Sequence, residues 1–112
     1  MKENTTVPAA EVTAEMIEEW KQKHGDVFKV TVDKGLESEK VAYVRKPTRQ
    51  ELKYAMMASK GGQDLISMQE VLVRHCMLGG DPVIQTDDEY FLAVAEKVSD
   101  LFKKREAELE KL

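Results

Sequence analysis

The first apolar pattern in the chain has the period of a helix. Its apolar positions are Met16, Ile17 and Trp20. Thr13 is suited to cap this helix and Gly25 to end it. The preceding segment is polar, contains Pro8, and has too little apolar content to order itself. We therefore expect a disordered tail over residues 1–12, followed by a short helix.

The pattern then changes to that of a β-strand. Over residues 27–33, Phe28, Val30 and Val32 alternate with polar residues. Residues 41–45 form a second β-rich run, and the polar segment 34–39 between the two is too short for a parallel crossover. The sequence thus predicts a β-hairpin. Because an isolated two-stranded ribbon is marginal in water, we expect it to pack on helices, to pair with strands of a partner, or both.

Three capping boxes, each preceded by a helix breaker, mark the starts of further helices. The boxes are Thr48–Glu51, Ser67–Glu70 and Thr86–Glu89. Asp64 is an alternative start for the second of these helices. Gly61-Gly62 and Gly79-Gly80 are expected to end the first and the second, because helices commonly end at glycine.

The apolar stripes of the last two helices predict what they bury. The earlier stripe consists of Leu65, Met68, Leu72 and Cys76, and the later one of Phe91, Val94, Val98, Leu101 and Phe102. We expect the last helix to run to Leu112 and to project from the domain beyond Phe102, where most residues are charged. The predicted fold is α+β and mostly α-helical: a short N-terminal helix, one β-hairpin, then three helices with a long C-terminal helix, in a single domain over residues 13–112.

Composition and charge narrow the class of protein. The 112 residues include 17 Lys and Arg against 21 Asp and Glu, for a net charge of -4, and this acidic balance disfavours nucleic acid as a partner. No apolar run approaches the roughly 18 residues of a membrane span, and residues 1–6 lack the apolar region of a secretory signal. The single cysteine excludes an intramolecular disulfide. We therefore expect a cytoplasmic protein that does not contact membranes.

The residues that could carry chemistry do not form a recognisable site. His75 and Cys76 are neighbours, so their side chains point about 100° apart on a helix, and His24 adds no zinc-site spacing. Cys76 lies on an apolar stripe, where burial raises the pKa of a thiol. Neither glycine pair is followed by the Lys-Ser or Lys-Thr of a phosphate-binding loop. We expect no metal, no cofactor, no catalytic residue and no enzymatic activity.

Apolar side chains are the first candidates for a binding surface. The chain has six methionines, and thioethers adapt to irregular or exchangeable apolar contacts. Met56, Met57 and Met68 lie on the two middle helices, and Leu109 and Leu112 lie in the charged C-terminal segment. These five residues are our candidates for contacting a protein partner, although most such methionines are simply core residues.

A basic cluster supplies the alternative. It consists of Arg45, Lys46, Arg49 and Lys53. These side chains could contact phosphates in a small regulatory module that binds nucleic acid. A solvated corner between a strand and a helix explains the same residues, and the acidic net charge favours that interpretation.

Part of the sequence resembles a known family. Val44–Leu52, which reads Val-Arg-Lys-Pro-Thr-Arg-Gln-Glu-Leu, resembles the strand-Arg-x-Pro-Thr-x-x-Glu-Leu segment of bacteriophage tail assembly chaperones. The similarity continues through Cys76–Gly80 and Asp87–Phe91 and, as an order of elements, covers residues 13–112.

The resemblance implies a role in viral morphogenesis. A member of this family binds the tape measure protein in the host cytoplasm, keeps its helical apolar surfaces from aggregating and assists tail assembly. Many families of this type also make a longer product by programmed frameshift. The chaperone hypothesis includes self-association of the chain into a homo-oligomer. The alternative, a prophage or bacterial regulatory module that contacts nucleic acid, stays open from the sequence.

Overall fold

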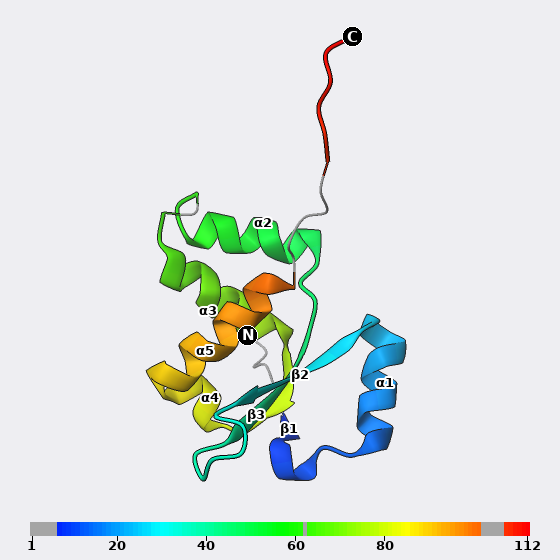
Figure 1. The fold of residues 1–112 in the computed structure, drawn as a ribbon, viewed down its shortest axis with the longest axis vertical. Coiled ribbons are helices and arrows are strands. Elements are labelled where there is room, and N and C mark those ends of the chain that lie inside the picture. Colours follow the sequence, from blue (N-terminus) through cyan, green and yellow to red (C-terminus); the bar gives the residue numbers. More distant parts are fainter. Residues whose placement is uncertain (1–6, 62, 102–106) are drawn as a thin grey trace.

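The computed structural model describes residues 7–61, 63–101 and 107–112 and shows an α+β fold that is mostly helical (Figure 1). The elements are, in chain order, β1 (Val7–Pro8), the 3-10 helix η1 (Ala9–Glu11), α1 (Ala14–His24), β2 (Val27–Val32), β3 (Lys40–Arg45), α2 (Arg49–Ala58), α3 (Leu65–Cys76), β4 (Met77–Gly80), α4 (Val83–Thr86) and α5 (Asp88–Asp100). No helix in the described ranges is both long and apolar enough to cross a membrane.

The strands form one sheet in the order β1-β4-β3-β2. The predicted hairpin is confirmed: β2 and β3 are antiparallel, with Val27 opposite Arg45 and Val32 opposite Lys40. The ribbon gains a third strand from its own chain, because β4 pairs antiparallel with β3, and β1 then adds in parallel to β4.

The two faces of the sheet are covered differently. Ala42 and Val44 of β3 are buried in the main core with residues of α2, α3, α4 and α5. Tyr43, which points to the opposite face because side chains alternate along a strand, packs against Trp20 of α1 with ring centroids 6.1 Å apart. Figure 1 shows α1 set apart from the other helices, as this arrangement requires.

Gly79 and Gly80 do not end a helix, so that prediction was wrong. Helix α3 ends at Cys76, and both glycines belong to β4. A Cβ on Gly79 would lie 3.0 Å from the carbonyl oxygen of Val7, and one on Gly80 would lie 2.5 Å from that of Val41. The glycines therefore let β4 approach its neighbours closely, which is a second common use of glycine in strands.

The disordered tail predicted over residues 1–12 extends too far. Val7 pairs with Gly79 and Pro8 with Gly80, and η1 follows directly. These residues are ordered because β4 offers them a strand edge, a long-range interaction that local composition does not reveal. The rest of the predicted tail, residues 1–6, lies outside the described residues.

Some of the predicted helix caps are confirmed and one is wrong. Thr48 and Glu51 form the reciprocal capping box of α2, and Asp64, the alternative start, caps α3. The box at Thr86 was wrong by one residue, because Thr86 ends the short helix α4 and the Asp87 side chain accepts the N–H groups that begin α5.

The core confirms most of the apolar stripes. Val94 and Val98 of α5 are fully buried, and Phe91 and Leu101 pack against the core. Leu65 departs from its stripe, because 55% of its surface is exposed. Phe102 lies outside the described residues.

The predicted helix to Leu112 was also wrong. Helix α5 ends at Asp100, and residues 107–112 are not helical. These residues extend away from the domain (Figure 1), as the charged sequence predicted.

Candidate functional site

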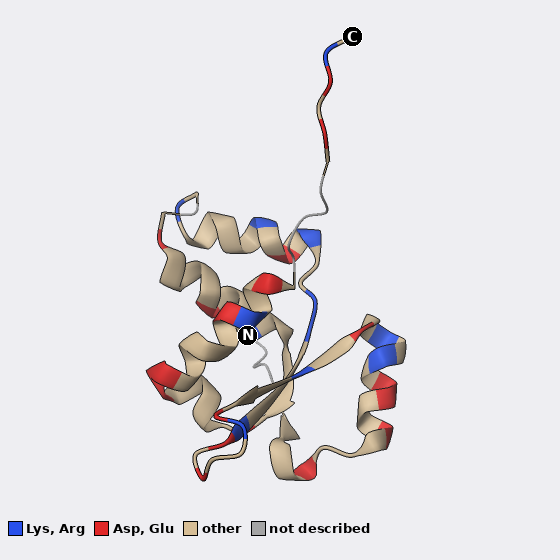
Figure 2. Ribbon diagram, viewed as in Figure 1, with Lys and Arg blue, Asp and Glu red and all other residues tan. Residues whose placement is uncertain are grey.

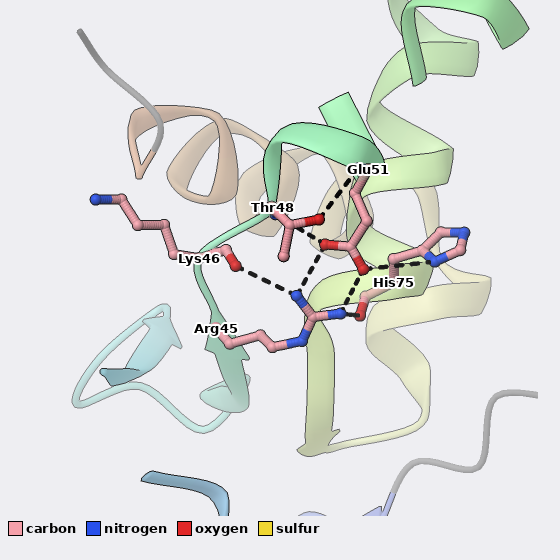
Figure 3. Close-up of polar contacts among 5 residues, drawn as sticks. All are labelled: Arg45, Lys46, Thr48, Glu51 and His75. Atoms are coloured by element: carbon pink, nitrogen blue, oxygen red, sulfur yellow. Dashed lines mark hydrogen bonds and ion pairs between the residues drawn. The ribbon is translucent and has the colours of Figure 1, made fainter. Parts of the chain in front are cut away.

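Arg45, at the end of β3, joins three elements (Figure 3). Its guanidinium donates two hydrogen bonds to the Glu51 carboxylate at 2.6 and 2.8 Å. It also donates to the carbonyl oxygens of His75 at 2.7 Å and Lys46 at 3.2 Å. The Glu51 carboxylate accepts the Thr48 N–H at 3.0 Å as well. One fork-shaped ion pair therefore ties β3 to the start of α2 and the last turn of α3.

The pKa shifts of Arg45 and Glu51 favour the charged form of each residue, as expected of a structural ion pair. The hydrogen bond from Arg45 is the main reason that the pKa of Glu51 is lowered to about 2, and the bond from the Thr48 backbone lowers it further. The same contact with Glu51 raises the pKa of Arg45. Because the Arg45 side chain is only 13% exposed and four of its five N–H donors are engaged, it has little capacity to bind a phosphate.

The other members of the basic cluster stay on the surface. Lys46 extends away from the Arg45 cluster (Figure 3), and Arg49 and Lys53 are exposed. Figure 2 shows that acidic and basic residues both occur on α1, α2 and α5. Of the four residues considered as possible phosphate contacts in the alternative interpretation, the structure thus leaves Lys46, Arg49 and Lys53 as exposed cations.

The residues that could carry covalent or metal chemistry are placed in structural roles. Cys76 is fully buried, and burial raises the pKa of its thiol to about 12, as its apolar stripe led us to expect. The His75 ring lies edge-on to Tyr54 with centroids 5.8 Å apart. Among the described residues, no three or more His, Cys, Asp or Glu side chains gather where they could hold a metal ion.

The described part of the chain contains a groove between α3 and the pair α4–α5, with a volume of about 290 Å³. It is lined by Ile66, Glu70, Val73, Arg74, Gln85, Asp88, Phe91 and Leu92. The α3 members lie at helical spacing on one face, and so do the α5 members. We call this feature the α3–α5 groove.

The groove combines an apolar floor with a charged rim. Val73 is buried and Phe91 packs against the core, while Ile66 and Leu92 remain 50% and 43% exposed. The rim carries the carboxylates of Glu70 and Asp88 and the single guanidinium of Arg74, so its net charge is negative. Such a surface can bind an apolar group flanked by cations, and the described residues that line it include no nucleophile paired with a base.

The residues predicted to contact a partner are not brought together in this groove. Met56 and Met57 are exposed on α2, whereas Met68 is half-buried against the core. Leu109 and Leu112 are fully exposed in the extended C-terminal segment. None of these five residues lines the groove.

Sequence reasoning missed the groove residues, although a signal was present. Ile66 and Leu92 are apolar but fall off the apolar stripes that face the core, so each leaves an apolar side chain on the surface. Which of these off-stripe residues face each other depends on how α3 packs against α5. Comparison of the chain with protein-family models, with curated proteins and with solved structures gives no match.

Proposed function

We propose that this protein is a non-enzymatic tail assembly chaperone of the bacteriophage type. In this proposal it binds a helical segment of the tape measure protein in the host cytoplasm and keeps that segment from aggregating. The observation that carries the proposal is the α3–α5 groove, whose apolar floor is continuous with the exposed side chains of Ile66 and Leu92. An amphipathic helix binds such a surface by laying its apolar face into the groove.

The dimensions of the groove suit a helix. On α3 the lining residues run from Ile66 to Arg74, which corresponds to about 12 Å along the helix axis, or roughly two turns. A partner helix presents apolar side chains at one-turn spacing over the same length. The groove volume of about 290 Å³ is at the low end for a small-molecule site, which favours a few inserted side chains over an enclosed ligand.

The charges of the groove define the partner further. Glu70 and Asp88 lie at its rim, and the neighbouring Asp87 and Glu89 add negative charge at the start of α5. A bound helix would therefore carry Lys or Arg beside its apolar stripe, because complementary charges steer association and fix orientation.

Exposed apolar residues on α2 extend the proposed surface. Tyr54, Met56 and Met57 are exposed on α2, which packs against α3. Methionine side chains adapt to different apolar contacts. In our proposal they support the binding of variable helical segments, while the groove supplies the main contact.

The test is a pull-down with the purified protein as bait and the product of the next long open reading frame as the candidate tape measure protein. Ile66→Glu and Leu92→Glu should each lower retention by roughly tenfold or more, because each puts a carboxylate where an apolar side chain must dock. Leu36→Glu is the matched control, since Leu36 is an exposed leucine in the hairpin loop. Equal retention of all three variants would contradict the groove proposal.

Binding of nucleic acid is the alternative function, and a separate DNA-binding measurement at low and high salt tests it. Lys46, Arg49 and Lys53 are exposed at one corner between a strand and a helix. Affinity that comes from phosphate contacts falls steeply with salt, whereas apolar helix binding should persist in high salt. Binding of DNA that is lost in Arg49→Ala and Lys53→Ala would favour a regulatory module over a chaperone.

A further inference from the structure

The two edges of the sheet differ in how they are protected. The β1 edge is two residues long and contains Pro8, a common way to prevent further strand pairing. The β2 edge is six residues long, pairs with β3 in unbroken register and contains no proline. Lys29 is its one charged residue. The β2 edge is therefore open to another strand.

The hydrogen bonds of Val41 in β3 show which backbone groups of β2 point away from the sheet. Its N–H donates to the Asp81 carboxylate at 2.8 Å and its C=O accepts the Asp81 N–H at 2.9 Å, so both groups are used on the β4 side. Thr31 lies opposite Val41 in β2. In an antiparallel ladder this pair cannot be the hydrogen-bonded kind, so the N–H and C=O of Thr31 point away from β3, and alternation gives Lys29 the same direction.

No other contact within the described part of the chain takes up these groups. The turn, loop and side-chain hydrogen bonds among residues 7–61, 63–101 and 107–112 do not involve the backbone of residues 27–32. The side chain of Phe28, which points toward the helices with Val30 and Val32, is 36% exposed at this edge. The edge thus offers both unpaired backbone groups and an apolar side chain.

The sequence of β2 disfavours one way in which two copies can pair and allows another. A two-fold axis through Lys29 would place two lysines directly opposite each other, which is unfavourable. An axis through Val30 places Lys29 opposite Thr31 of the other copy and Phe28 opposite its Val32. In that register the outward N–H and C=O groups of Lys29 and Thr31 meet each other, and Phe28 gains an apolar neighbour.

We propose that two copies of this chain associate through antiparallel pairing of their β2 edges, centred on Val30, to form one continuous sheet. The β2 strand contributes no residue to the α3–α5 groove, so the proposed dimer stands independently of the proposed chaperone function.

Sedimentation velocity over a concentration series tests the association. Thr31→Pro removes an outward N–H and spares the β2–β3 ladder, because proline is tolerated on an edge strand whose N–H faces away from the sheet. It should raise the dimer Kd by roughly tenfold or more. Thr31→Ala keeps the N–H and should dimerise like the unmodified chain. Denaturation curves identify any variant that fails to fold.

Cysteine cross-linking tests the register. Val30→Cys should form a disulfide between copies under mild oxidation, because the residue faces itself across the axis. Lys29→Cys should not, because in this register the two positions are more than about 7 Å apart. The native Cys76 is fully buried and does not compete.

Each outcome decides the proposal. A chain that is monomeric at every concentration, a Thr31→Pro variant that dimerises unchanged, or cross-linking at Lys29→Cys in place of Val30→Cys would overturn it. Ile66→Glu should remain dimeric, which separates failure of this proposal from failure of the groove proposal.

Discussion

Gly80 occupies a position where a side chain meets the backbone of the neighbouring strand. A Cβ there would lie 2.5 Å from the carbonyl oxygen of Val41 and 2.8 Å from Cα of Ala42, and the φ angle of +142° disfavours any residue except glycine. We expect Gly80→Ala to lower the free energy of unfolding by about 2–4 kcal/mol, through both steric overlap and backbone strain. Urea denaturation measures this loss.

Gly35 is the matched control, since its φ angle is also positive, at +85°, but a Cβ there would meet nothing within 4 Å. Gly35→Ala should therefore lower the free energy of unfolding by only about 1 kcal/mol, from backbone strain alone. Equal losses in the two variants would show that the close approach of β4 to β3 adds nothing.

Glu51 should control the acid stability of the fold. Its pKa is about 2 in the folded protein against an ordinary value of 4.5, mainly because Arg45 donates to its carboxylate. A lowered pKa means that the ionised carboxylate contributes stability fully above pH 4.5, and that this contribution is lost as the pH falls through about 2. Glu51→Gln should lower the free energy of unfolding at neutral pH by roughly 2–3 kcal/mol.

Denaturation at a series of pH values measures this effect. The unmodified chain should lose stability between pH 4.5 and 2, and Glu51→Gln should lose less over the same interval. Glu37→Gln, which changes an exposed carboxylate in the hairpin loop, should keep the full acid dependence. A Glu51→Gln profile parallel to that of the unmodified chain would contradict the role of the ion pair.

At the level of elements, two adjacent residues, Thr86 and Asp87, were candidates for the N-cap of α5, and the structure assigns this role to Asp87. The Asp87 carboxylate accepts the N–H of Glu89 at 2.9 Å and that of Tyr90 at 3.4 Å. Asp87→Ala should therefore cost about 1 kcal/mol of stability. Thr86→Ala should change it by less than about 0.5 kcal/mol, because Thr86 ends α4 and caps nothing in α5. Thermal denaturation compares the two variants. A larger loss of stability for Thr86→Ala than for Asp87→Ala would favour the capping box predicted at Thr86.

Elements that depend on local signals were predictable from the sequence. The hairpin alternation, the Thr13 cap of α1 and the Thr48 box of α2 all lie within a few residues of what they determine. Strands β1 and β4 were not predictable in this way, because they form by pairing with distant segments. A Gly-Gly pair such as Gly79-Gly80 can end a helix or allow the close approach of a neighbouring strand, and the local sequence does not distinguish the two.

The difference between local signals and long-range packing also explains which features of the candidate site could be predicted from the sequence. The exclusion of Cys76 as a nucleophile needed only its place on an apolar stripe. The α3–α5 groove needed the packing of two helices whose lining residues are about 20 positions apart, and no local pattern encodes which of their faces meet. Arg45 was a possible phosphate contact because it lies in a cluster of basic residues. The sequence did not reveal that Glu51, which completes the capping box with Thr48, also pairs with Arg45.

For the whole molecule, the exposed methionines of α2 and the α3–α5 groove should contribute separately to binding of the helical partner. Met57 is 76% exposed, so Met57→Ala should change the free energy of unfolding by less than about 0.5 kcal/mol. It should weaken binding of the helical partner only a few-fold, against roughly tenfold or more for Ile66→Glu, because rim contacts contribute less than docked apolar anchors. Isothermal titration calorimetry measures both affinities, and the reverse order would move the main contact to α2.

An NMR titration tests the groove most directly. Backbone amide shifts of the full chain are recorded as a helical segment of the proposed tape measure protein is added, at low and at high salt. We predict the largest changes at residues 66–74 and 85–92, at both salt concentrations, with the hairpin loop 33–39 unaffected. Changes centred on residues 45–53 that disappear in high salt, or no changes at all, would contradict apolar helix binding in the α3–α5 groove.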